Sequence, residues 1–223
     1  MKKTAILVAM QKEYDLLSSF LERQDFNFAN DIVVALSGIG KVNAALTAAK
    51  LIEKDQARQV ISTGVAGGLD TTLNKGDLVV GNQYAYHDVW CGEPNQIGQI
   101  QGLPARFNTD ADLLRIALSF NDKFPVRSSL IVTGDQFVTE PEELKTIQTN
   151  FPTAAACDME SAAIAQTCHL YNIPFLSVRI ISDVAGKEDG NDKQYQDFWS
   201  QAPKTTFQYI TELLQRICSS QEQ

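Results

Sequence analysis

The 223-residue sequence lacks several features that would each define a class of function. No apolar run approaches the roughly 18 residues that a membrane span requires, so we expect no membrane partner. Basic residues are outnumbered, 19 against 27 acidic ones, and the net charge of -8 argues against a nucleic-acid partner. Only two histidines and four cysteines are present, and His87, Asp88 and Cys91 match no familiar zinc spacing. We therefore predict no metal site.

The remaining composition is that of an ordinary soluble protein. Cys157 and Cys168 stand in apolar surroundings, which is typical of free thiols in a reducing compartment. The apolar N-terminal run is about as short as that of a signal peptide can be, and charged residues follow where a cleavage site should stand. We expect a cytoplasmic protein. Its length and its 44% hydrophobic content fit one large α/β domain over residues 1–223.

Apolar segments alternate with amphipathic or Ala-rich ones along the chain, which predicts alternating strands and helices. The expected strands are 4–10, 31–37, 58–63, 76–86, 126–133, 153–157 and 174–181. The expected helices are 11–22, 42–54, 111–120, 141–150, one that begins near residue 160, and one long final helix at 195–218. A polar loop is expected at 186–193. This order predicts a three-layer α/β/α sandwich around a mixed, mostly parallel sheet.

Two glycine-rich segments follow predicted strands. The segment 38–41 (Gly-Ile-Gly-Lys) lacks the third glycine of a dinucleotide fingerprint, and the cluster 64–68 lacks the Lys and Ser/Thr of a P-loop. Neither implies a bound cofactor, and we predict none. Both segments remain credible as turns that bring the backbone close to a ligand.

Charged residues occur where buried structure normally excludes them. Asp183 ends a near-continuous apolar run, Glu160 precedes an Ala-rich helix, and Glu13 follows a predicted strand. Each alone could be a helix cap or a solvated first-turn carboxylate, and Phe137 alone could be a core residue. Together with Arg179, however, they gather at the strand ends where open α/β sheets bind ligands.

This set of residue types favours acid–base chemistry. Two or three carboxylates, one arginine and one aromatic suit a flat, neutral, polyhydroxylated molecule. Glycosidic cleavage fits, because it needs one carboxylic acid and one carboxylate. A Ser-His-Asp hydrolase is disfavoured, because the sequence has no Gly-x-Ser-x-Gly elbow.

Seven segments carry a resemblance that covers about residues 3–214: AMQKEYDLL, SGIGKVNAA, STGVAGGL, YHD, TGDQFV, ACDMESAAIAQ and VRIISDVA. In this order they resemble the 5'-methylthioadenosine/S-adenosylhomocysteine nucleosidases of the nucleoside phosphorylase superfamily. The resemblance implies that superfamily's fold and hydrolysis of the N-glycosidic bond, which gives adenine and a thioribose product. The nearest alternative is a nucleosidase for aminodeoxyfutalosine or futalosine. A phosphate-dependent nucleoside phosphorylase and a non-catalytic nucleoside-binding protein are further alternatives.

The resemblance also implies catalytic roles. Asp183 is similar to the general acid that protonates adenine N7, and Glu13 to the base that activates the attacking water. Glu160 is expected to bind the ribose hydroxyls and to stabilise an oxocarbenium-like transition state. Arg179 is expected to hold the water and Glu160.

Substrate-binding roles follow from the same likeness. Phe137 is expected to stack on adenine, the Val138 backbone to read its Watson–Crick edge, Met159 to lie beneath the sugar and Ser182 to orient Asp183. The other residues expected in the substrate pocket are Met10, Ile39, Val65, Gly67 and Tyr195. Many family members carry Ser where Val65 stands, so the water would here depend on Glu13 and Arg179.

The stretch 89–108 is rich in Gly, Pro and Gln and is predicted to be a long loop. It carries apolar residues that a monomer need not cover, namely Trp90, Ile97, Ile100 and Leu103. We therefore expect a subunit contact here. The resemblance implies a homodimer with segment 91–104 near the neighbouring active site, although this segment is less aromatic than in most of the family.

Overall fold

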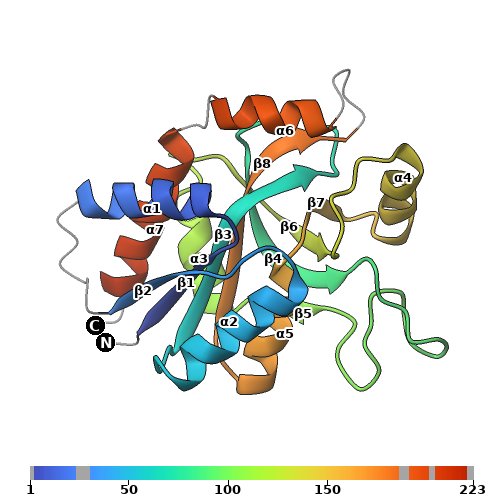
Figure 1. The fold of residues 1–223 in the computed structure, drawn as a ribbon, viewed down its shortest axis with the longest axis horizontal. Helices are drawn as coiled ribbons and strands as arrows, with labels where there is room; N and C mark the ends of the chain where they lie inside the picture. Colours follow the sequence, from blue (N-terminus) through green and yellow to red (C-terminus); the bar gives the residue numbers. More distant parts are fainter. Residues whose placement is uncertain (1–2, 24–30, 186–190, 201–203, 220–223) are drawn as a thin grey trace.

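The computed structural model describes residues 3–23, 31–185, 191–200 and 204–219 (Figure 1). The strands are β1 (Thr4–Val8), β2 (Ile32–Leu36), β3 (Gln59–Gly68), β4 (Leu78–Tyr86), β5 (Phe107–Asn108), β6 (Val126–Thr133), β7 (Ala154–Asp158) and β8 (Phe175–Val184). The helices are α1 (Gln11–Arg23), α2 (Lys41–Glu53), α3 (Ala111–Leu118), α4 (Pro141–Asn150), α5 (Ser161–Tyr171), α6 (Asn191–Ser200) and α7 (Lys204–Ser219).

The eight strands form one mixed sheet, which confirms the mixed α/β prediction. Along the order β2-β1-β3-β7-β6-β4-β5, β3–β7 and β4–β5 are antiparallel pairs and the other pairs are parallel. Strand β8 pairs with β3 in parallel and with β4 in antiparallel orientation. Strands β3, β7, β6, β4 and β8 therefore close a ring, a feature that the sequence pattern did not predict.

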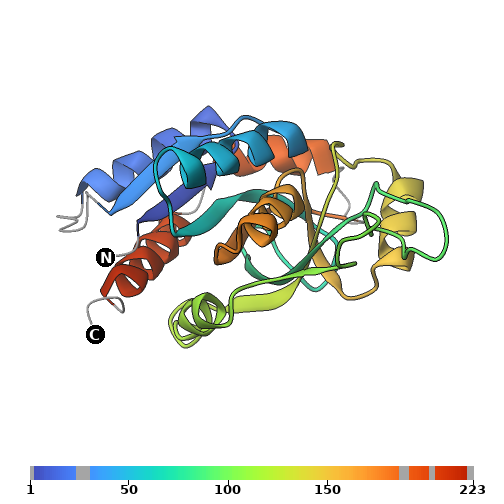
Figure 2. The same ribbon diagram turned by 90° about the horizontal axis from the view of Figure 1, so that it is seen from below.

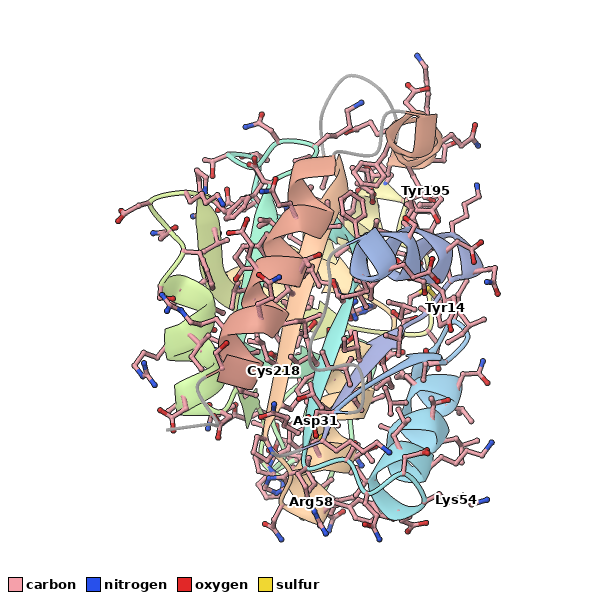
Figure 3. The ribbon with its side chains drawn as sticks, turned by 90° about the vertical axis from the view of Figure 1, so that its left-hand side faces the viewer. Tyr14, Asp31, Lys54, Arg58, Tyr195 and Cys218 are labelled. Atoms are coloured by element: carbon pink, nitrogen blue, oxygen red, sulfur yellow. The ribbon has the colours of Figure 1, made fainter. Side chains whose placement is uncertain are left out.

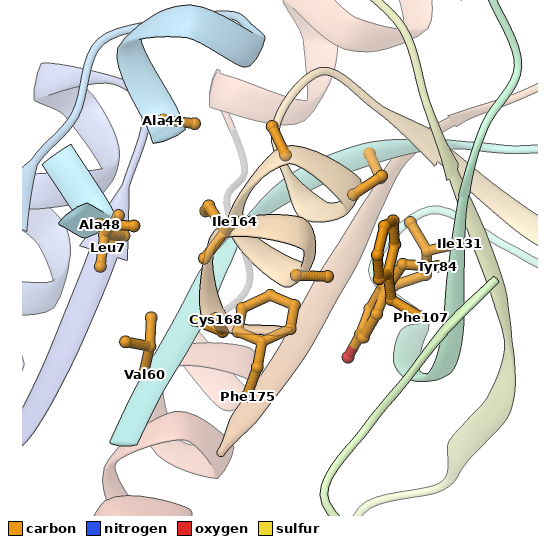
Figure 4. Close-up of a cluster of buried hydrophobic side chains, with 14 of the residues drawn as sticks. Leu7, Ala44, Ala48, Val60, Tyr84, Phe107, Ile131, Ile164, Cys168 and Phe175 are labelled. Carbon is orange, nitrogen blue, oxygen red and sulfur yellow. The ribbon is translucent and has the colours of Figure 1, made fainter. Parts of the chain in front are cut away.

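Helices cover both faces of the sheet at β1 and β3, because neighbouring residues on these strands join different cores. On β1, Leu7 packs in a cluster with α2 and α5, whereas Ile6 packs with α1, α3 and α7. On β3, Val60 belongs to the same cluster as Leu7, and Ile61 belongs to the same cluster as Ile6. Figure 4 shows the first cluster, in which Ala44 and Ala48 of α2 face Ile164 of α5. Figure 2 shows α2 along the upper edge of the molecule and α3 at the lower edge, with strands between them.

The C-terminal region differs from the prediction. One helix at 195–218 is wrong, because α6 ends at Ser200 and α7 begins at Lys204. The sequence has Pro203 at this break, and a proline inside a helix removes a hydrogen bond and clashes with the preceding turn. Of the predicted loop 186–193, residues 191–193 instead begin α6, and 186–190 lie outside the described residues.

Two further boundaries were predicted wrongly. Strand β3 runs through the glycine cluster to Gly68 and does not end at Thr63, with a register shift between Ala66 and Gly67. The predicted loop 89–108 contains the short strand β5, which pairs with β4. Within the part of the chain that the structure describes, no helix has the length and apolar character needed to cross a bilayer.

Candidate active site

A cavity of about 210 Å³ opens beside the carboxyl ends of β1, β3, β6, β7 and β8. Figure 3 shows Tyr195 of α6 near this end of the molecule, far from Arg58, which precedes β3. Every residue that the sequence predicts for the site lines the cavity except Arg179, which lies behind its wall. The lining residues from that prediction are Met10, Glu13, Ile39, Val65, Gly67, Phe137, Val138, Met159, Glu160, Ser182, Asp183 and Tyr195.

Glu13 lies in the first turn of α1 with only 3% of its surface exposed. Its Oε2 accepts hydrogen bonds from the backbone N–H groups of Ala9 (3.1 Å) and Met10 (3.0 Å). Its Oε1 accepts from the N–H of Val65 at 2.9 Å. Burial raises the pKa of Glu13, while these three N–H groups and the charge of Arg179 act in the opposite direction. Thus Val65, whose side chain is inert, holds Glu13 through its backbone.

Gly64 makes room for two of the charged groups. A Cβ at this position would lie 2.6 Å from Glu13 Oε1 and 3.1 Å from Arg179 Nη1, and the residue has φ +151°. Any side chain here would push the carboxylate and the guanidinium apart. The glycine cluster therefore serves the site by letting these two groups approach the strand.

Arg179 is fully buried in β8, with 1% exposure. Its Nε donates to Asp158 Oδ2 at 2.6 Å, and its Nη2 donates to the hydroxyls of Ser62 (3.0 Å) and Ser161 (3.1 Å). The same Nη2 lies farther from Glu160 Oε2, at 3.9 Å. The main partner of Arg179 is thus Asp158, which the sequence reasoning missed. The rule that a buried cation needs a buried anion could have identified it, because Asp158 ends a short apolar strand.

Glu160 precedes α5 as its N-cap residue and is 6% exposed. Its Oε1 accepts from the backbone N–H of Gly40 at 2.9 Å. Burial and then the negative charge of Asp158 raise the pKa of Glu160 to about 7, against the opposing effects of Arg179 and the Gly40 N–H. The turn before α2 therefore gives this N–H to a carboxylate of the site, and not directly to a ligand as the sequence suggested.

Asp183 lies near the end of β8 and is 1% exposed. The hydroxyl of Ser182 donates to its Oδ1 at 2.6 Å. Gly67 lies against the other oxygen, since a Cβ there would be 3.3 Å from Oδ2. Burial raises the pKa of Asp183, and only the Ser182 hydrogen bond lowers it. Asp183 therefore retains its proton to a higher pH than an ordinary aspartate.

An aromatic side chain forms the outer wall of the cavity. Phe137 is 49% exposed and lies in tilted contact with Tyr195, with ring centroids 5.5 Å apart. The Tyr195 hydroxyl donates to Met10 Sδ at 3.2 Å, and Asn191 Nδ2 donates to the Val138 carbonyl at 3.4 Å. Helix α6 thus closes one side of the cavity. Asn191 is a lining residue that the sequence analysis did not identify.

The cavity is lined by four buried carboxyl groups, those of Glu13, Asp158, Glu160 and Asp183, and by the half-exposed ring of Phe137. Among the described residues, no group of three or more histidine, cysteine or acidic side chains is placed to hold a metal ion. The chemistry that these residues can perform is proton transfer to and from a bound molecule.

Comparison with known proteins gives consistent matches over nearly the whole chain. The model of the phosphorylase superfamily matches residues 3–215. A 5'-methylthioadenosine/S-adenosylhomocysteine nucleosidase of Geobacillus sp. (strain WCH70) is 36% identical, over 96% of this chain and 99% of the relative. The Neisseria meningitidis nucleosidase of that name, solved with methylthio-immucillin-A, is 36% identical with a TM-score of 0.85, over 96% and 99% of the two chains. Futalosine hydrolase of Helicobacter pylori is 27% identical with a TM-score of 0.87, over 96% and 97%.

Proposed function

Since this chain belongs to the 5'-methylthioadenosine/S-adenosylhomocysteine nucleosidases of the phosphorylase superfamily, we propose that it is an enzyme that hydrolyses the N-glycosidic bond of these two nucleosides. The products are adenine and the corresponding thioribose. The observation that carries this function is the pair Glu13 and Asp183, two buried carboxyl groups that line one cavity with different hydrogen-bond partners. Glu13 suits the role of a general base, and Asp183 suits that of a general acid.

Glu13 is proposed as the general base. Its two oxygens are held by three backbone N–H groups, so the carboxylate is fixed in position and its negative charge is stabilised. The remaining lone pairs are available to accept a proton from a water that attacks C1'. Arg179 adds positive charge beside Glu13 and favours its ionised form.

Asp183 is proposed as the general acid that protonates N7 of the leaving adenine. Burial raises its pKa and so favours the protonated form, and Ser182 fixes the orientation of the carboxyl group. Protonation of N7 converts the base into a neutral leaving group, so the C1'–N9 bond breaks without releasing an anion. The sugar then carries the developing positive charge.

Glu160 is proposed to bind the ribose hydroxyls and to stabilise that positive charge. The Gly40 N–H positions its carboxyl group, and Arg179 contacts it at 3.9 Å. Met159, which also lines the cavity, is proposed to lie beneath the sugar. A buried carboxylate near a developing cation stabilises the transition state more than the neutral ground state.

Recognition of the base is proposed to come from Phe137 and Val138. The half-exposed ring of Phe137 offers a face for stacking, and the Val138 backbone offers an N–H and a carbonyl for the edge of adenine. Five further residues that the sequence predicts for the pocket also line the cavity. They are proposed to contact the sugar and its 5' substituent: Met10, Ile39, Val65, Gly67 and Tyr195.

A futalosine nucleosidase is the second candidate. It is supported by the match to the Helicobacter pylori futalosine hydrolase, whose TM-score of 0.87 exceeds the 0.85 of the Neisseria meningitidis enzyme although its identity is only 27%. The two candidates share the reaction type and differ in the 5' substituent and the base. Substrate competition therefore separates them.

The test is adenine release from 5'-methylthioadenosine, with and without phosphate, with identification of the sugar product. We expect release that does not depend on phosphate, together with free methylthioribose. A requirement for phosphate would overturn the hydrolase in favour of a phosphorylase. Release from futalosine compounds but not from methylthioadenosine would favour the second candidate. Binding without release from either class would indicate a non-catalytic nucleoside-binding protein.

We also propose that residues 1–223 form one nucleoside phosphorylase-like domain with the layer order of a three-layer α/β/α sandwich. The family match over residues 3–215 and the helices on both faces of the sheet support this. A cytoplasmic location is proposed as well. It is supported by the four free cysteines, two of which are buried.

A homodimer is proposed, with segment 91–104 near the neighbouring active site. The apolar side chains of Trp90 (68% exposed) and Ile97 (46%) support a subunit contact there, as do Val42 and Leu46 on α2. Sedimentation at micromolar concentration tests this proposal. A fully active monomer would contradict it.

A further inference from the structure

Three charged residues meet beside the active-site cavity, and the proposed reaction gives none of them a role. Lys41 Nζ lies 2.7 Å from Asp88 Oδ2 and 3.8 Å from Asp135 Oδ2. The side chains are 23%, 26% and 45% exposed, respectively. Each residue comes from a different segment named in the sequence analysis: SGIGK, YHD and TGDQFV. We call Lys41, Asp88 and Asp135 the charged cluster.

The charged cluster is also bonded to the backbone at two points. Asp135 Oδ1 accepts from the N–H of Lys41 at 2.7 Å, and Asp88 Oδ2 accepts from the N–H of Asp135 at 3.0 Å. The N-cap residue of α2 is Gly40, which has no side chain for this purpose. Asp135 therefore caps α2 from a distant part of the chain, and its negative charge is favoured at a helix N-terminus.

The charged cluster joins two walls of the cavity. On one side, Lys41 directly follows Ile39, which lines the cavity, and Gly40, whose N–H holds Glu160. At its other end, Asp135 directly precedes residues 136–138, which include Phe137 and also line the cavity. We define residues 39–40 with Glu160 as the sugar wall, and residues 136–138 as the base wall.

We propose that Lys41, Asp88 and Asp135 are positioning residues that fix the distance between the sugar wall and the base wall. The inference rests on the proposed function, because that function assigns these walls to the two halves of a nucleoside. A ligand that spans both walls senses their separation, whereas a free base contacts only one of them. Misplacement of reacting groups by about 1 Å can lower a rate by roughly a hundredfold.

This role differs from general support of the fold in a measurable way. If the charged cluster only stabilised the protein, its loss would weaken base and nucleoside binding alike, or neither. If it sets the separation of the walls, its loss weakens binding of the nucleoside and leaves binding of the base unchanged. The ratio of the two dissociation constants is therefore the informative quantity.

The experiment measures the Kd of adenine and of a C-glycosidic 5'-methylthio nucleoside analogue, which cannot be hydrolysed, by titration calorimetry. In Lys41→Met and Asp88→Asn we expect the Kd of adenine to stay within about twofold. The Kd of the nucleoside should rise about tenfold and kcat/KM should fall by at least that factor. Lys41→Arg keeps a cation within reach of both carboxylates and should restore both values to within about threefold.

The matched control is Lys123→Met, which breaks an ion pair of 2.6 Å with Glu212 that contacts neither wall. Neither Kd should change in this variant. Equal weakening of adenine and nucleoside in the variants of the charged cluster, or no change in either, would overturn the inference. A wild-type protein that binds neither ligand would overturn the proposed function together with it. Binding of both without hydrolysis would overturn only the proposed function, because the binding ratio still tests the separation of the walls.

Discussion

Glu13 and Asp183 lie in the same cavity and are buried to nearly the same degree, 3% and 1% exposed, yet their surroundings differ. Glu13 accepts three backbone hydrogen bonds and has the guanidinium of Arg179 nearby. Asp183 has the hydroxyl of Ser182 as the one hydrogen-bond donor that lowers its pKa. Burial raises the pKa of both carboxyl groups; three backbone N–H groups and the charge of Arg179 act against it at Glu13, and the Ser182 hydroxyl acts against it at Asp183.

The difference shows how one cavity can hold an acid and a base made from the same functional group. Fixed N–H dipoles and a nearby cation stabilise a carboxylate, whereas burial with a single donor favours a neutral carboxylic acid. Glu160 experiences both kinds of influence, because burial and Asp158 raise its pKa to about 7 while Arg179 and the Gly40 N–H oppose the rise. The three groups can therefore differ in protonation at one pH.

The largest effect is expected from removing either member of the pair. Glu13→Gln and Asp183→Asn keep the shape of the side chain but abolish the proton transfer, so kcat should fall by about 10²- to 10⁴-fold in each. Assays of adenine release at saturating substrate measure kcat for each variant. Asp15→Asn is a matched control, because it removes an exposed carboxylate two residues away on α1 and should leave kcat unchanged.

Rates near that of the wild type in both variants would refute the assignment of base and acid. A loss confined to Asp183→Asn would show that water attacks without help from Glu13. Thermal melting of each variant establishes that the fold is retained, so that a loss of rate reports on chemistry.

A pH profile gives the next largest effect. Glu13 must be ionised, so the rate falls as the pH drops through its pKa; Asp183 must be protonated, so the rate falls as the pH rises through its pKa. Because three N–H groups and a cation favour the ionised form of Glu13, whereas one hydroxyl favours that of Asp183, we expect a bell-shaped kcat/KM with the Glu13 limb on the acidic side. A rate that rises steadily with pH would contradict this, since it would require no protonated acid.

The sequence alone predicts the fold class and the positions of the three carboxyl groups at one edge of the sheet. Glu13, Glu160 and Asp183 each stand where an apolar segment gives way to a helix or a loop, and parallel strands bring such positions to one edge. The mixed α/β fold followed from the alternation of strand and helix patterns in the same way. These are local signals, and the structure places all three residues on one cavity.

Contacts between distant segments could not be predicted in this way. Nothing in the local pattern pairs Gly40 with Glu160 or Val65 with Glu13, because these bonds join backbone groups to side chains across the fold. The closed ring of strands was missed for a related reason. The glycine cluster looks like a loop, but it continues β3 far enough to pair with both β7 and the end of β8.

The smallest and most specific effect concerns Ser182. Its hydroxyl donates to Asp183 Oδ1 at 2.6 Å and lowers the pKa of that carboxyl, so Ser182→Ala should raise it further. Because Asp183 works in its protonated form, the alkaline limb of the pH profile should move to higher pH, as expected for the loss of a hydrogen bond that stabilises the carboxylate. The acidic limb, set by Glu13, should stay in place, and kcat at the optimum should fall only severalfold. Movement of the acidic limb instead would mean that the acid and the base have been assigned the wrong way round.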